Sequence, residues 1–228
     1  MQPIHTAWLV FLIPLLTVHT CWLWSSLAGA IDWCLPYWNG CTSISRAARS
    51  SDALFLFRAA MLINACLLAI YWLQAGSFLK LQAGDQKIGW MQLTGVTGAA
   101  FLVLYVDFLG TDGQVYQLLR RYGVTFYFAF TLLAQLLLLR QIMPMVQVRP
   151  AAAPWIKAKT WLCWWILALG IASIAGNALL QDPAKDRWEN IMEWHFALAM
   201  NAWFGLSAML WQRLGYRLRP VQNPPGQK

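Results

Sequence analysis

Six long stretches without a charged residue constrain this chain more than any other feature. They cover residues 6–31, 59–79, 88–106, 122–139, 160–181 and 194–212. The hydrocarbon core of a bilayer is about 30 Å thick, and a helix needs about 20 apolar residues to cross it. Because backbone polar groups in lipid must bond within their own segment, each stretch is expected to form a spanning helix.

The composition agrees with a chain that lies mostly in a membrane. Of its 228 residues, 59% are hydrophobic and only 11% are charged, whereas soluble domains carry about 25% charged residues. We therefore expect an all-α fold: one six-transmembrane-helix bundle at 1–219, followed by a disordered tail at 220–228. The expected helices are 7–30, 53–75, 89–110, 122–145, 159–180 and 190–212.

The basic residues predict how the bundle is oriented. Ten Lys and Arg lie on the side that holds both termini: Lys80, Lys87, Arg140, Arg149, Lys157, Lys159, Arg213, Arg217, Arg219 and Lys228. The other seven lie opposite, so the excess favours cytoplasmic termini. The basic tail is typical of an anchor to anionic lipid. We expect no nucleic-acid partner, because there is no folded basic domain to bind one.

The first apolar stretch raises the question of a secretory signal. Ala28-Gly29-Ala30 resembles a cleavage site, but no Lys or Arg precedes the stretch, and it exceeds the usual 7–15 apolar residues. We expect a retained helix. The short loops, the 15 tryptophans and the lack of eukaryotic sorting signals favour a bacterial inner membrane.

Two of the five cysteines, Cys34 and Cys41, fall in the first non-cytoplasmic loop. An oxidising compartment would permit a disulfide between them, and the sequence leaves bridged and free thiols equally open. Cys21, Cys66 and Cys163 fall inside helices, where cysteine packs as a small hydrophobic residue.

Polar side chains that are costly in lipid gather in the outer half of the expected bundle. They are His19, Arg58, Asn64, Asp107, Asn177, Glu193 and His195. Titratable groups inside membrane segments are functional candidates because burial of their charge is unfavourable. Their shared depth predicts a polar cavity that opens toward the outer leaflet.

This cavity has a catalytic interpretation and a structural one. His19 or His195 could act as a general base beside the carboxylate of Asp107 or Glu193, and Arg58 could form an ion pair with either acid. Alternatively, the acids stabilise helix ends and the histidines bond to backbone carbonyls. We expect no metal, because Glu193 and His195 diverge by about 200° on a helix. No motif indicates a cofactor.

Five short motifs lie in the first loop and in the helices: Cys34-Leu35-Pro36-Tyr37, Ser43-Ile44-Ser45, Phe57-Arg58, Tyr71-Trp72 and Ile191-Met192-Glu193-Trp194. Together they resemble the Frag1/DRAM/Sfk1 family, above all its branch that remodels the lipid of GPI anchors. The resemblance implies a membrane-lipid ligand and lipid-remodelling chemistry, by acyl or head-group transfer. It assigns roles to Ser43, Ser45, Arg58 and Glu193. Arg46-Ala47-Ala48-Arg49 replaces a glycine-rich stretch of the family, and Ser51-Asp52 a Pro-Glu element, so the resemblance does not define the substrate.

Other function classes stay open at this point. A membrane scaffold with a protein partner would explain the missing catalytic motif and the small-residue row of Ala168, Ala172 and Gly176. A small transporter would need paired helix breaks at mid-depth, and only Pro14 offers one. The sequence does not indicate an oligomeric state.

Overall fold

The computed structural model describes residues 1–83 and 88–218, and helices are the only regular elements in these two segments. The long helices are α1 (Pro3–Leu27), α4 (Ala53–Ala83), α5 (Gly89–Asp107), α6 (Gln114–Ile142), α8 (Ala153–Leu179) and α9 (Ala184–Arg213). The short ones are α2 (Pro36–Asn39), α3 (Ile44–Arg49), α7 (Met145–Val148) and the 3-10 turn η1 (Pro150–Ala152). The predicted disordered tail, 220–228, lies outside the described residues.

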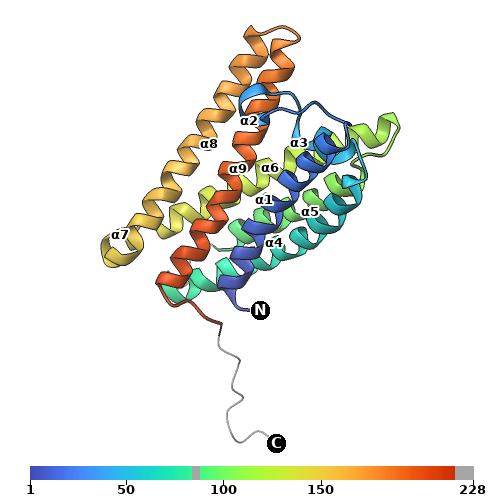
Figure 1. Ribbon diagram of the computed structural model, residues 1–228. Helices are drawn as coiled ribbons and strands as arrows, with labels where there is room; N and C mark the ends of the chain where they lie inside the picture. Colours follow the sequence, from blue (N-terminus) through green and yellow to red (C-terminus); the bar gives the residue numbers. More distant parts are fainter. Residues whose placement is uncertain (84–87, 219–228) are drawn as a thin grey trace, which may run out of the picture.

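The six long helices form a closed ring (Figure 1). α1 packs on α4, α4 on α5, α5 on α6, α6 on α8, α8 on α9, and α9 back on α1. α1 begins and α9 ends at one end of the ring, here called the terminal end. α2 and α3 lie at the opposite end, here called the loop end.

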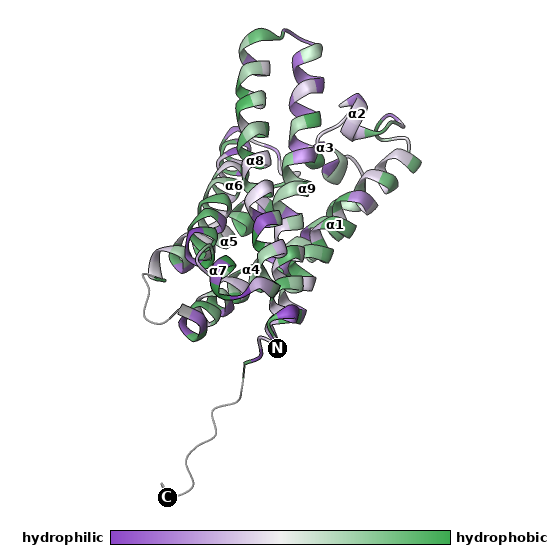
Figure 2. Ribbon diagram, turned by 90° about the vertical axis from the view of Figure 1, so that its left-hand side faces the viewer, coloured by the Kyte–Doolittle hydropathy of each residue, from purple (hydrophilic) through white to green (hydrophobic). Residues whose placement is uncertain are grey.

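Five helices are long and apolar enough to cross a membrane: α1, α4, α5, α6 and α8. Figure 2 shows the hydrophobic residues that run along these helices. α9 is as long as the others, but its first turns carry Asp186, Glu189 and Glu193, and it is not among the five. The all-helical fold and its apolar helices are those of a multi-pass membrane protein, as the sequence predicted.

Several helix boundaries differ from the prediction. α6 begins at Gln114 rather than near 122, and α8 begins at Ala153 rather than near 159. The prediction ended helices at charged residues, but long basic side chains can stay in a helix and extend toward the head groups. α5 ends at Asp107, short of the predicted 110, because the turn after it places Gly110 at φ +79.

The small-residue row on α8 is used within the chain. Trp188 of α9 donates its indole N–H to the Ala172 carbonyl at 3.0 Å. A Cβ at Gly176 would lie 2.0 Å from the same indole nitrogen. The two helices therefore approach closely because residue 176 has no side chain, and this part of the row does not present a free face to another protein.

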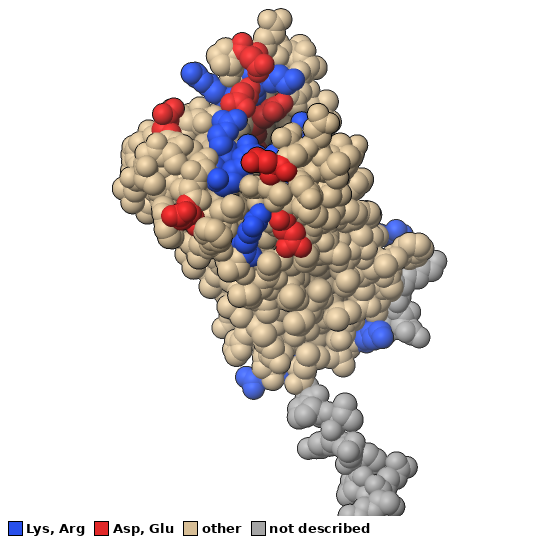
Figure 3. Space-filling model, turned by 90° about the vertical axis from the view of Figure 1, so that its right-hand side faces the viewer, with Lys and Arg blue, Asp and Glu red and all other residues tan. Residues whose placement is uncertain are grey.

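Charged residues concentrate at the loop end. On the face drawn in Figure 3, most Lys and Arg and all the visible Asp and Glu lie toward one end, and only a few basic side chains lie near the other. The exposed hydrophobic side chains include Leu16, Ile63, Ile171 and Ile174 on the long helices. This distribution is the one expected where lipid tails surround the middle of a bundle.

Candidate functional site

The first loop, residues 28–52, is fixed to the first turns of α9. Asn190 donates its side-chain amide to the Gly40 carbonyl at 2.8 Å, and the Trp194 indole donates to the Thr42 carbonyl at 2.9 Å. Gly40 has φ +58, and a Cβ there would collide with the backbone of Arg187. Glycine is therefore needed where the loop meets α9.

Two further links hold this loop in place. Cys34 and Cys41 form a disulfide that closes the segment around α2, with their Cα atoms 6.5 Å apart. Arg46 of α3 forms an ion pair with Asp186 of α9 at 3.2 Å. α2 and α3 are thus held against the side of the first turns of α9.

The two serines of the Ser-Ile-Ser motif lie at the start of α3. Ser43 is the N-cap residue, and its hydroxyl accepts the Arg46 backbone N–H at 3.0 Å. The hydroxyls of Ser43 and Ser45 lie 3.2 Å apart. The Glu193 carboxylate interacts with the backbone amides of Ile44 and Ser45. Ser43 and Glu193 therefore both stabilise the first turn of α3.

His19 has a protein partner for each ring nitrogen. Nδ1 lies 2.6 Å from the Leu15 carbonyl, and because a carbonyl only accepts, this nitrogen carries the proton. Nε2 lies 3.0 Å from the Tyr37 hydroxyl. Burial raises the pKa of Tyr37 to about 12, so the hydroxyl keeps its proton at neutral pH and is able to donate it to the Nε2 of a neutral ring.

His195 lies on the other side of Tyr37. Its Nδ1 donates to the Ile191 carbonyl at 3.0 Å, and its ring meets those of Tyr37 and Trp38 edge-on, with centroids 5.3 and 6.3 Å away. The structure thus brings His19 and His195 to one tyrosine. In the described part of the chain, neither histidine hydrogen-bonds to a carboxylate.

Arg58 bonds to the end of α5 rather than to an acid. Its Nη2 donates to the carbonyls of Leu109 at 2.6 Å and Asp107 at 3.2 Å, and to the Thr111 hydroxyl at 3.3 Å. The Asp107 carboxylate itself is exposed. Carbonyls at a helix C-terminus carry partial negative charge, so Arg58 stabilises this end of α5. Within the described segments, the ion pair with Asp107 or Glu193 that the sequence suggested does not form.

The two predicted asparagines lie apart from these groups. Asn64 is buried on α4, and within residues 1–83 and 88–218 its Oδ1 has no hydrogen-bond partner. Asn177 is exposed on the last turn of α8. Neither lines the cavities described next.

A polar cavity of about 340 Å³ lies at the loop end between α3, α5 and α6. We call it the basic cavity; it is lined by Ser45, Tyr105, Gln114, Gln117, Leu118, Arg120, Arg121 and Val124. Arg49 of α3 lies close enough to repel Arg120. Among the described residues, Arg49, Arg120 and Arg121 form no ion pair, although the Glu193 carboxylate is close enough to attract Arg49.

These three arginines give the basic cavity its chemistry. A guanidinium presents paired N–H donors that match the oxygens of a carboxylate or phosphate. Glutamine side chains on the same wall add neutral donors. The arrangement is suited to hold an anion that bears several oxygens.

An apolar chamber of about 60 Å³ adjoins the basic cavity, and Tyr105 and Val124 line both. Glu193 forms part of its wall, among side chains such as Phe57 and Met61. The chamber is too small for a lipid tail. Tyr105 separates it from the basic cavity, so Glu193 lies on the far side of Tyr105 from that cavity. No cluster of His, Cys, Asp or Glu that could hold a metal occurs in the described segments.

Sequence reasoning missed Lys159, which is fully buried on α8 in the terminal half. Its ammonium donates to the Trp203 carbonyl at 3.2 Å and to the Ser207 hydroxyl, and it lies 3.0 Å from the centre of the Trp203 ring. Ser207 also bonds to the Tyr71 hydroxyl at 2.7 Å. A buried titratable side chain therefore also lies in the terminal half, outside the polar layer that the sequence predicted.

A local signal for this lysine exists in the sequence. Pro154 is favoured in the first turn of a helix, and α8 indeed begins there. Lys157 and Lys159 then project about 200° apart, so only one of them can face solvent.

No family model, curated protein or solved structure matches this chain.

Proposed function

We propose that this chain is a six-helix membrane protein that binds the phosphate of a lipid head group in the basic cavity. The observation that carries the proposal is a group of three arginines, Arg120 and Arg121 in the cavity wall and Arg49 beside them, none of which forms an ion pair among the described residues. The cavity lies beside the ends of apolar helices, where a bilayer supplies phosphates in abundance.

The proposal includes α9 as the sixth span. α9 has 30 residues, or about 45 Å at 1.5 Å per residue, which exceeds the hydrocarbon thickness of about 30 Å. Its acidic first turns can therefore stand outside the lipid while the remainder crosses it. The place of α9 between α1 and α8 in the ring supports this reading.

The same proposal places the terminal end in the cytoplasm. Basic residues described at that end include Lys80, Arg140, Lys157 and Arg213, and an excess of Lys and Arg marks the cytoplasmic side. The basic cavity then faces the outer leaflet. The bacterial inner membrane remains a prediction from the sequence.

We favour binding over acyl or head-group transfer. The resemblance to the Frag1/DRAM/Sfk1 family supports lipid as the ligand. However, Ser43 and Glu193 stabilise α3, Arg58 stabilises α5, and both nitrogens of His19 are bonded within the protein. These contacts explain the residues by their roles in the fold, without a catalytic step.

The test is a titration of the purified protein, followed by native mass spectrometry. The ligands are dioleoyl phosphatidylglycerol and dioleoylglycerol, which share their chains and differ in the phosphoglycerol head group. We expect a preference for the phospholipid, and at least a tenfold loss in Arg120→Gln/Arg121→Gln, because charge-assisted hydrogen bonds contribute about 1.5–3 kcal/mol each.

Arg187→Gln is the matched control, since Arg187 is an exposed arginine at the loop end outside the cavity. It should bind phosphatidylglycerol like the wild type. Equal affinity for both lipids, or an equal loss in the control, would remove the basis of the proposal.

A further inference from the structure

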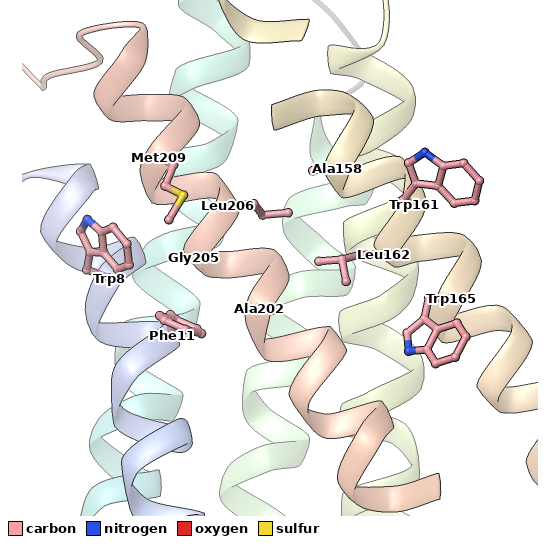
Figure 4. Close-up of a pocket in the computed structure, with 10 residues that line it drawn as sticks. All are labelled: Trp8, Phe11, Ala158, Trp161, Leu162, Trp165, Ala202, Gly205, Leu206 and Met209. Atoms are coloured by element: carbon pink, nitrogen blue, oxygen red, sulfur yellow. The ribbon is translucent and has the colours of Figure 1, made fainter. Parts of the chain in front are cut away.

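An apolar groove of about 700 Å³ lies in the terminal half, away from the basic cavity (Figure 4). α9 forms its floor, and α1 and α8, which both pack on α9, form its walls. We call it the terminal groove. Its volume falls within the roughly 300–1,000 Å³ of ligand pockets.

Small residues create this groove. Ala158 of α8 and Ala202 and Gly205 of α9 leave space that larger side chains would fill. In Figure 4, Leu162 and Leu206 point toward each other across the gap, and Phe11 points toward α9 near Gly205. The lining is apolar, so the occupant must be an apolar chain.

Two cations mark the mouth of the groove at the terminal end. Lys157 lies one turn before Trp161 on α8, and Arg213 lies one turn after Met209 on α9. Trp161 and Met209 line the groove, and helical residues four positions apart share a face. Both cations are exposed, on the terminal side of the residues that line the groove.

No described carboxylate opposes these cations at the terminal end. The acids within residues 1–83 and 88–218 belong to the loop end and its turns: Asp32, Asp52, Asp107, Asp112, Asp182, Asp186, Glu189 and Glu193. The charge at the mouth of the groove is therefore complementary to an anionic molecule.

We infer that the terminal groove binds one anionic phospholipid of the adjacent leaflet, with an acyl chain between α1 and α8 and its phosphate at Lys157 and Arg213. A chain gains little hydrophobic energy by leaving other lipid tails. Selectivity must come from the cations, each of which contributes roughly fivefold in affinity near a membrane surface. This inference does not depend on the basic cavity.

The experiment uses phosphatidylglycerol with a photoreactive diazirine in its acyl chain, and phosphatidylcholine with the same chain. The full-length protein is irradiated in nanodiscs, and crosslinked peptides are mapped by mass spectrometry. We expect phosphatidylglycerol to crosslink to residues 158–165 and 202–209. Lys157→Gln/Arg213→Gln should weaken its binding roughly 25-fold, to the level of phosphatidylcholine.

Two matched controls separate this site from general lipid contact. Arg140→Gln removes an exposed cation at the terminal end outside the groove, and should change nothing. Ala202→Phe fills the groove and should abolish the crosslinks, whereas Ala175→Phe, at an exposed position on α8 outside the groove, should not. Equal crosslinking by both lipids, or an Arg140→Gln loss that matches the double variant, would overturn the inference.

Discussion

Lys159 illustrates how one buried amino group can be accommodated without an acid. Its ammonium has two oxygen acceptors, on Trp203 and Ser207, and the face of an indole ring. Such rings attract cations through their negative faces. A buried charge with incomplete partners is unfavourable, so the stability of this part of the bundle should depend on Ser207.

We therefore predict that Ser207→Ala lowers the free energy of unfolding by about 1–3 kcal/mol, because it leaves a buried donor unsatisfied. Lys159→Met should be neutral or stabilising, since an apolar side chain of similar length replaces the charge. In the Lys159→Met background, Ser207→Ala should lower the free energy of unfolding by less than it does in the wild type, as measured by SDS titration. Strictly additive effects would contradict the proposed interaction.

Arg58 is a second residue whose contacts differ from its expected role. Its three acceptors all belong to residues 107–111, so its loss should loosen the end of α5. Arg58→Gln should accelerate amide hydrogen exchange across 107–113 and leave phosphatidylglycerol affinity unchanged. A fall in affinity without faster exchange would instead favour a direct role in binding.

Among the elements, α3 depends on contacts from outside itself. It has six residues, too few to be stable alone, and relies on Ser43, Glu193 and the Arg46–Asp186 pair. Ser45 of α3 lines the basic cavity, and Arg49 of the same helix lies near Arg120 in its wall. The position of this helix therefore decides the shape of that cavity.

Ser43→Ala should cost about 1 kcal/mol through the lost N-cap and weaken phosphatidylglycerol binding by displacing α3. Ser43→Asp should restore both properties, because aspartate is also a strong N-cap. The checks are unfolding by SDS titration and native mass spectrometry. If aspartate restores stability but not binding, the serine hydroxyl itself contacts the ligand.

The helices also show best what the sequence could and could not predict. Length and polarity located the long helices, because a span in lipid requires a sustained apolar run. They did not locate the start of α6 at Gln114, since Arg120 and Arg121 marked a helix end in the sequence. The basic cavity was missed for the same reason, as two of its arginines were assigned to a loop.

At the scale of the whole molecule, the prediction of one polar layer holds only in part. His19, His195 and Glu193 do gather near the first loop, but Asn177 faces outward and Lys159 is buried in the other half. Depth along a helix follows from the sequence, whereas the direction of a side chain depends on which neighbours the helix acquires.

The topology makes a prediction at this scale too. If α9 crosses the membrane, single cysteines at Lys185 and Gln212 should react with an impermeant maleimide from opposite sides, in a background without accessible thiols. Position 212 should react from the same side as a cysteine at Gln2, because α1 begins where α9 ends. Labelling of 185 and 212 from one side would restrict the chain to five spans.

The most direct measurement is an electron cryomicroscopy map of the protein in nanodiscs of phosphatidylglycerol. We predict phosphate density in the basic cavity, within hydrogen-bond distance of Arg120 or Arg121, with the tails of that lipid outside the ring. A cavity that contains only water, or arginines turned away to solvent while lipid surrounds the rest of the bundle, would contradict it.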